Sequence, residues 1–252
     1  MTRQRPNLLS TVYSVTTLLT ALMLSWLLLL SVDFGYSFWY DAIGIDDNIS
    51  EFGPENRYRD GFEDTSREQR LRLFAQIVDG VSHSGTGLED IVYTTPRHDD
   101  PIPLLRHDEL VHLQDVANLI DSWHSAGAIG SAAWLLLTAG LVYRPRALAS
   151  LGRVAIGYGL IALIAGVTLA LLGFEKVFYQ LHIWIFPEDH PWFFYYQDSL
   201  MSTMMKAPDL FMYIGLAWIG IAVPLFCGLY IAARRLLLTR PPLAGKPPLL
   251  KQ

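Results

Sequence analysis

Residues 8–32 read LLSTVYSVTTLLTALMLSWLLLLSV, and this stretch decides the fold class because it contains no charged side chain. The hydrocarbon core of a membrane is about 30 Å thick and takes about 20 helical residues to cross. Similar apolar stretches cover 126–143, 151–173 and 212–235. Charged residues make up 17% of the chain, whereas soluble domains carry about 25%. The sequence therefore predicts an integral membrane protein, mainly α-helical, with a bundle of four transmembrane helices.

The first stretch could instead be a cleaved signal peptide, with Arg3 and Arg5 as its basic start. The apolar part of a signal peptide is about 7–15 residues long, and a cleavage site with small residues follows it. Residues 8–32 are longer than that, and no small-x-small pattern comes after them. We therefore expect this stretch to stay in the protein as the first membrane anchor.

Acidic and basic residues occupy different links between the four stretches. Ten of the 19 basic residues, and none of the acidic ones, lie before residue 8, between 144 and 153, or after 233. All 24 acidic residues lie in 33–125 and 174–211, where nine basic residues leave a formal net charge of −15. Because basic residues stay on the cytoplasmic side, we expect both termini in the cytoplasm and these two regions outside the membrane. Their negative charge argues against nucleic acid as a partner.

The region 33–125 is too long for a simple loop and predicts a small extracytoplasmic cap of mixed α and β structure. Apolar residues at helical spacing predict a helix over 67–81, with Thr65 and Glu68 as its capping box. The aromatic run 34–40 predicts a strand or an interfacial belt. The rest of the cap is predicted as a polar loop at 41–64, a short strand at 91–93, a turn-rich stretch at 96–103 and a second helix from Asp108 into the second span.

The remaining segments give fewer structural signals. Residues 174–211 are predicted to form an extracytoplasmic aromatic loop, in which His190 is an exposed loop residue. Residues 236–252 contain four prolines and are predicted to be a disordered cytoplasmic tail. Cys227 is the only cysteine, so a disulfide within the chain is excluded, and we expect a small apolar residue in the fourth span.

The segment from Asp108 onward is the first of two that indicate chemistry. On a helix, three carboxylates share the side that carries His112, namely those of Asp108, Glu109 and Asp115. A carboxylate beside an imidazole orients the ring and favours its protonated form. Two alternatives are a solvated polar face and a metal site, since Glu109-x-x-His112 has the spacing of carboxylate-bridged metal centres.

The second segment contains His182 among aromatic residues, just beyond the third stretch. Phe178, Trp192 and Phe194 give it a composition that suits the lipid headgroup level, so an aromatic belt with an incidental histidine is the alternative. A short link joins the second and third stretches, which are therefore antiparallel neighbours. His112 and His182 can thus meet at the outer surface of the membrane.

The order of these motifs resembles the bacterial lipoprotein intramolecular transacylases, a family of membrane proteins with four spans. The similar residues are Glu109-x-x-His112-x-x-Asp115-Val116 before the second span and Phe178-x-x-x-His182-x-x-x-Phe186-Pro187 after the third, followed by Trp192-x-Phe194, Asp198-x-Leu200 and Pro208-x-x-Phe211. The resemblance extends over most of the chain. This sequence differs from the family pattern at Ala117, where the family tends to have a basic residue, and in the 187–191 link. These two differences bear on substrate preference more than on the reaction, because both histidines are present.

The resemblance implies an acyltransferase in the bacterial cytoplasmic (inner) membrane, a multi-pass protein with its active site on the extracytoplasmic side. Such an enzyme moves the acyl chain from the glycerol 2-position of a diacylglyceryl-cysteine lipoprotein to the α-amino group of the same molecule. The product is a lyso-form lipoprotein. The implied partners are diacylated lipoproteins as substrates and membrane lipid, and neither a metal nor another cofactor is implied.

An intramolecular transfer suits these residues, because the amine and the ester are held together and no acyl-enzyme is needed. We expect His112 to act as the base, held by Asp115 or Asp108. His182 then donates to the oxyanion or to the leaving oxygen, and the two roles can be exchanged. Substrate contacts are expected from five further residues: Glu109, Phe178, Trp192, Phe194 and Asp198.

Two other function classes stay open at this point. One is a metal-dependent membrane hydrolase that uses Glu109 and His112. The other is a non-enzymatic membrane subunit that binds an extracytoplasmic partner. A transporter is disfavoured, because pathways through the membrane usually need polar groups and the interiors of the apolar stretches carry no charge.

Overall fold

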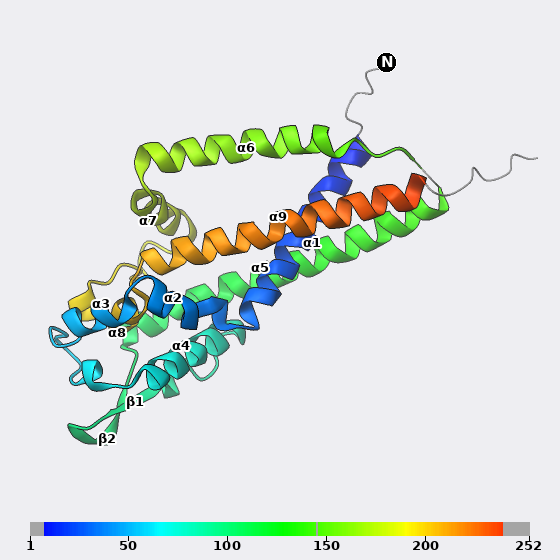
Figure 1. The fold of residues 1–252 in the computed structure, drawn as a ribbon. Coiled ribbons are helices and arrows are strands. Elements are labelled where there is room, and N and C mark those ends of the chain that lie inside the picture. Colours follow the sequence, from blue (N-terminus) through cyan, green and yellow to red (C-terminus); the bar gives the residue numbers. More distant parts are fainter. Residues whose placement is uncertain (1–7, 145, 239–252) are drawn as a thin grey trace, which may run out of the picture.

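The computed structural model describes residues 8–144 and 146–238 (Figure 1). Among these residues, four helices are long and apolar enough to cross a membrane: α1 (Leu8–Leu30), α5 (His107–Tyr143), α6 (Leu151–Leu172) and α9 (Asp209–Leu238). The prediction of a mainly helical chain with four apolar helices is thereby confirmed. Residues 236–238 continue α9, and the rest of the predicted tail lies outside the described residues.

Helix α5 is continuous over 37 residues, so the predicted cap helix and the second span are one element. At 1.5 Å per residue the helix is about 56 Å long, nearly twice the thickness of about 30 Å of the hydrocarbon core. Its acidic residues all lie between Asp108 and Asp121, and 126–143 carry no charge. The first third of α5 therefore extends beyond the apolar segment and carries His112 and Asp115 outside it.

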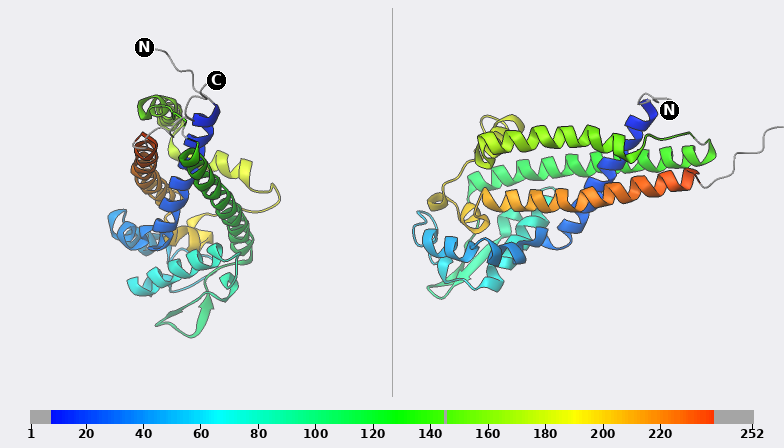
Figure 2. Two further views of the ribbon diagram at one scale, coloured as in Figure 1. Left: turned by 90° about the vertical axis from the view of Figure 1, so that its right-hand side faces the viewer. Right: turned by 45° about the horizontal axis from the view of Figure 1, so that its top comes forward.

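Helix α1 is the central element of the membrane part and crosses the other long helices diagonally (Figure 2). Its buried face is rich in hydroxyl groups, and Tyr13 OH lies 3.0 Å from Thr138 Oγ1 of α5. A Cβ atom at Gly127 of α5 would lie 2.5 Å from the sulfur of Met23. Small residues and interhelical hydrogen bonds therefore bring α1 and α5 close together, as is usual between membrane helices.

Helix α6 contrasts with α1, since none of its residues is buried. It contacts the bundle near its start, where Tyr158 packs edge-on against Phe226 of α9, with ring centroids 5.5 Å apart. Gly173 has a φ of 82° and allows the chain to turn directly into α7 (Phe174–Ile185). The predicted aromatic loop 174–211 therefore begins with a helix, which carries His182.

The remaining elements gather at one end of the long helices, and we call them the head (Figure 1): α2 (Tyr36–Ala42), α3 (Ile45–Phe52), α4 (Arg67–Ser82), the antiparallel hairpin of β1 (Val92–Thr95) and β2 (His98–Pro103), and α8 (Leu200–Met205). Helix α8 comes from a distant part of the chain. Two hydrogen bonds fix it to the others: Tyr36 OH donates to Met204 O at 2.7 Å, and Asn48 Nδ2 donates to Thr203 O at 2.8 Å.

Of the two alternatives for residues 34–40 the strand is excluded, and the prediction of a loop over 41–64 is wrong. Residues 34–40 do not form a strand: α2 begins at Tyr36, and its buried residues Tyr36 and Tyr40 are four apart, as on a helix, while Phe38 is exposed. The polar stretch 41–64 is not all loop, since it contains α3. A strand also forms within the predicted turn-rich stretch, where Ile102 pairs with Tyr93.

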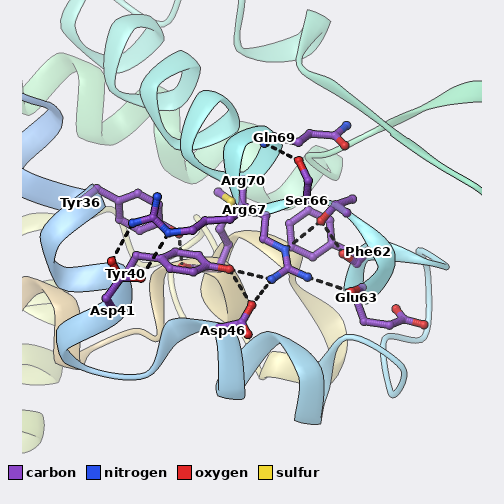
Figure 3. Close-up of polar contacts among 12 residues, drawn as sticks. Tyr36, Tyr40, Asp41, Asp46, Phe62, Glu63, Ser66, Arg67, Gln69 and Arg70 are labelled. Atoms are coloured by element: carbon purple, nitrogen blue, oxygen red, sulfur yellow. Dashed lines mark hydrogen bonds and ion pairs between the residues drawn. The ribbon is translucent and has the colours of Figure 1, made fainter.

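The predicted helix 67–81 is present as α4, but its N-cap is Ser66, whose hydroxyl accepts from Gln69 N. Thr65 Oγ1 is occupied by the buried Arg70, which donates to it from Nε at 2.9 Å. Arg70 also donates to Tyr40 OH at 2.6 Å, Asp46 Oδ1 at 2.5 Å and Glu63 O at 2.8 Å (Figure 3). One guanidinium thus joins α2, α3 and α4.

Candidate active site

A cavity of about 330 Å³ lies where the head meets the long helices, and its wall is almost entirely apolar. Helices α1, α4, α5, α7, α8 and α9 all contribute to it. Three polar side chains line it: His112, His182 and Ser202. The sequence prediction that the two histidines can meet holds in this structure, since their ring centroids are 6.0 Å apart.

His112 lies in the second turn of α5 and is buried, with 8% of its surface exposed. Its Nδ1 atom is enclosed and has no hydrogen-bond partner among the described residues. Burial lowers the pKa of His112 to about 4; the nearby His182 adds to this effect, and Asp115 opposes it. The ring is therefore neutral at neutral pH.

His182 is oriented by its own helix. Its Nδ1 lies 2.8 Å from Phe178 O, and because a carbonyl oxygen only accepts, Nδ1 must carry the proton. In the neutral ring, Nε2 is then left as a proton acceptor. Burial lowers the pKa of His182, while the Phe178 carbonyl opposes this shift. His182 is thus a neutral imidazole with a defined tautomer.

Aromatic rings surround the two imidazoles. Phe178 lies 4.1 Å from His182, and Trp192 lies 5.1 Å from it, between ring centroids. Phe194 lies 6.0 Å from His112. All three aromatic residues line the cavity, so the structure brings Phe178, Trp192 and Phe194 together with both histidines.

Asp115 does not hold His112 as predicted. Its Oδ2 accepts a hydrogen bond of 2.6 Å from Nδ1 of His190, and in the described part of the chain no hydrogen bond joins Asp115 to His112. His190 is therefore not a free loop residue, although 38% of its side chain is exposed. Asp115 still acts on His112 through its charge.

Glu109 and Asp198 lie outside the cavity wall. Glu109 is completely buried: Oε1 accepts from Ser199 Oγ at 2.5 Å, and Oε2 accepts from Arg106 N at 2.6 Å. Burial raises its pKa, although these hydrogen bonds act in the opposite direction. Asp198 forms an ion pair with Arg57, at 3.1 Å. Both carboxylates thus hold the surrounding structure in place rather than face the cavity.

Sequence reasoning misses Ser202, which contributes a hydroxyl-bearing side chain to the cavity wall. It lies on α8, whose start is fixed because Ser199 Oγ accepts from Ser202 N at 2.9 Å. No motif marks Ser202, since its place in the wall depends on how α8 packs. Within residues 8–144 and 146–238, no three His, Cys, Asp or Glu side chains are grouped as a metal site would require.

A sequence model of the family described as lipoprotein intramolecular transacylase, Lit, matches residues 65–207 of this chain, which is more than half of it. The chain belongs to this family. The matched region runs from the start of α4 to the end of α8, and it includes both histidines of the cavity. Members of the transacylase family are acyltransferases, and the motif resemblance described above is confirmed.

Solved structures show that the fold is shared with a membrane-integral protein. The lipoprotein intramolecular transacylase of Bacillus cereus is 16% identical, with a TM-score of 0.61 over 92% of this chain and 95% of that one. A variant of that protein with one histidine replaced by alanine gives a TM-score of 0.59 at 16% identity, over 92% and 93% of the two chains. The comparison with curated protein sequences found no match to this chain.

Proposed function

We propose that this protein moves the acyl chain from the glycerol 2-position of a diacylglyceryl-cysteine lipoprotein to the α-amino group of that same molecule. The product is a lyso-form lipoprotein, and neither a metal nor another cofactor takes part. The observation that carries the proposal is the pair of neutral imidazoles, 6.0 Å apart, in a cavity whose wall is almost entirely apolar. An apolar wall suits a substrate with two acyl chains.

The chemical step needs one proton acceptor and one hydrogen-bond donor. The amine nitrogen attacks the ester carbonyl carbon, and a C–N bond forms while the nitrogen loses a proton. The acyl C–O bond then breaks, and the glycerol oxygen takes up that proton. Because amine and ester belong to one molecule, holding them together provides most of the advantage, and no acyl-enzyme is required.

The tautomer of His182 favours this residue as the base, which exchanges the two roles first expected. Its Nδ1–H is engaged with Phe178 O, so Nε2 is the atom that can take the proton from the amine and return it to the glycerol oxygen. His112, with its enclosed and unpaired Nδ1, fits a donor that stabilises the oxyanion from Nε2–H. A neutral imidazole can fill that role.

Phe178, Trp192 and Phe194 are proposed to contact the acyl part of the substrate. Their rings pack around the imidazoles and belong to the apolar wall. Glu109 and Asp198 have no such position, and we assign them to holding the site together. Asp115 is proposed to act on His112 by charge alone.

We further propose that both termini are cytoplasmic in a bacterial cytoplasmic membrane and that the head is extracytoplasmic. This rests on the distribution of charge, since all 24 acidic residues lie in 33–125 and 174–211. The proposed spans are 8–32, 126–143, 151–173 and 212–235. The histidine pair then lies at the outer surface of the membrane, near the lipid-anchored end of a lipoprotein.

The two alternative function classes lose support. A metal-dependent hydrolase would use Glu109 with His112, but both carboxylate oxygens of Glu109 accept hydrogen bonds from Ser199 and Arg106. A non-enzymatic subunit does not fit membership of a family of acyltransferases.

The test uses purified protein in phospholipid vesicles and a diacylglyceryl-cysteine lipopeptide with a deuterated chain at the glycerol 2-position. The product is an isomer of the substrate, so tandem mass spectrometry must find the deuterated chain on nitrogen at unchanged total mass. In an equal mixture of labelled and unlabelled lipopeptides with different sequences, no label should cross between them. Release of free fatty acid, or transfer between molecules, would contradict the proposal.

A further inference from the structure

Residues 186–195 connect α7 to the head and have no regular secondary structure. Three of their aromatic rings contact the histidine pair. Phe186 lies 5.0 Å from His112, Phe194 lies 6.0 Å from it, and Trp192 lies 5.1 Å from His182. This segment therefore forms part of the wall around both imidazoles, although no helix or strand holds it in shape.

A single side-chain hydrogen bond ties the segment to α5. His190 Nδ1 donates to Asp115 Oδ2 at 2.6 Å, and in the part of the chain that the structure describes no other side chain of 186–195 is hydrogen-bonded to another element. Asp115 lies one helical turn beyond His112, and its side chain is mostly buried. The backbone of His190 also closes a tight turn by donating to Pro187 O at 3.2 Å.

We propose that His190 is a positioning residue for the transfer reaction: through Asp115 it holds 186–195 against α5, so that Phe186, Trp192 and Phe194 enclose the histidine pair. The kinetic consequences rest on the proposed function. The contact of 186–195 with α5 through His190 and Asp115, which we call the hold, does not rest on it, because the exposure of the segment can be measured without any substrate.

The hold depends on the proton of His190. The Asp115 carboxylate raises the pKa of His190, and Asp189, on the same segment, adds a smaller effect. The protonated ring adds the Coulomb attraction of an ion pair to this hydrogen bond, so it holds Asp115 more strongly than the neutral ring does. The ion pair needs the imidazolium form of His190, so it is lost as the pH rises through the raised pKa.

The substrate amine, with a pKa of about 8, titrates in a similar range and would obscure a simple pH profile. The kinetic test therefore compares wild type with His190→Gln at each pH, because the amine contributes equally to both. Glutamine keeps a neutral donor for Asp115 but carries no charge. We expect His190→Ala to lower kcat/KM by about threefold to tenfold at neutral pH, mainly through KM, and His190→Gln to recover part of it.

The decisive quantity is the ratio of the wild-type rate to the His190→Gln rate. If the charge of His190 tightens the hold, this ratio falls toward one as the pH rises past the pKa of His190. A ratio that stays constant across the pH range would contradict the dependence of this contact on the proton of His190.

A second measurement follows the segment itself. Phe193→Cys, in a Cys227→Ala background, places the only thiol of the chain on the half-exposed Phe193 position, and maleimide labelling reports its exposure. We expect His190→Ala to speed labelling several-fold. The matched control is His98→Ala in the hairpin. This change removes the hydrogen-bonded pair of His98 with Asp60 and should leave labelling unchanged.

The outcomes separate the two proposals. Unchanged labelling in the His190→Ala protein overturns the hold, whatever the activity shows. Faster labelling in a protein whose wild type transfers no acyl chain supports the hold and removes the proposed function.

Discussion

Arg70 in the head and His112 in the cavity are both buried polar side chains, but their surroundings are opposite. Every nitrogen of the Arg70 guanidinium donates to a partner, and the four partners lie on α2, on α3 and in the segment before α4. His112 has an enclosed Nδ1 with no partner among the described residues. The Arg70 guanidinium has a hydrogen-bond partner for every nitrogen, whereas the His112 imidazole has an unpaired nitrogen beside a cavity.

The difference indicates which of the two groups holds the fold and which does chemistry. A buried polar group is nearly always hydrogen-bonded, because leaving it unpaired costs about 1–3 kcal/mol. This protein leaves a buried polar atom unpaired at His112 but pairs every nitrogen of Arg70. We therefore expect changes at Arg70 to alter stability and changes at the histidine pair to alter the rate.

The largest expected effect is on the rate, at His182. His182→Gln removes the base but keeps a side chain of similar polarity, so we expect acyl transfer to fall by about 10²–10⁴-fold. His112→Gln should fall in the same direction by less, because it removes a donor rather than the proton acceptor. Initial rates with the deuterated lipopeptide measure both. Near-normal activity in the double variant would remove the histidine pair from the mechanism.

The next effect is on stability, at Arg70. Arg70→Met keeps the volume and loses all four hydrogen bonds, so we expect a loss of about 2–4 kcal/mol in the free energy of unfolding. Activity per folded molecule should remain. The matched control is Arg67→Met on the same helix, whose ion pair with Asp41 is solvent-exposed and should change stability little (Figure 3). Denaturant titration in detergent compares them, and equal losses would show that burial of Arg70 does not matter.

The sequence predicts the histidine pair well, because positions along the chain are enough for it. His112 precedes one apolar stretch, His182 follows the next, and a short link makes the two stretches neighbours. The partner of Asp115 could not be predicted in this way. His190 lies 75 residues away on an irregular segment, and its position depends on how 186–195 packs.

Other parts of the site were hidden for related reasons. Glu109 lies on the same side of α5 as His112 by spacing, but its carboxylate accepts from Ser199, the N-cap of α8, which only the packed head brings near. The aromatic run 34–40 suits both a strand and a helix by composition. Burial at a spacing of four decides for the helix, and burial cannot be observed in a sequence.

A smaller effect concerns pH and tests whether His112 is costly to bury. Its pKa is lowered in the folded protein, to about 4 from an ordinary value of 6.5, so the unfolded chain binds the proton more readily between these values. Stability should therefore fall as the pH drops from 6.5 toward 4. In His112→Leu this part of the decrease should be absent. Thermal unfolding at several pH values measures it, and parallel curves for the two proteins would contradict a buried neutral ring.

The smallest expected effect is at Ser202, and it tests the direct mechanism most sharply. Ser202 brings a hydroxyl-bearing side chain to the wall of the cavity that both imidazoles line, so it is the residue to test as a serine nucleophile. If the amine attacks the ester directly, the hydroxyl forms no bond to the acyl group, and Ser202→Ala should lower the rate by only a few-fold. If an acyl-enzyme forms instead, Ser202→Ala should be as damaging as His182→Gln, and a labelled chain should be found on the wild-type protein.

Cys227→Ala is the control, because this thiol lies on α9 away from the cavity wall and should have almost no effect. The ratio of the Ser202→Ala and His182→Gln rates therefore distinguishes a cavity that only aligns the reacting groups of its substrate from one that takes the acyl chain itself.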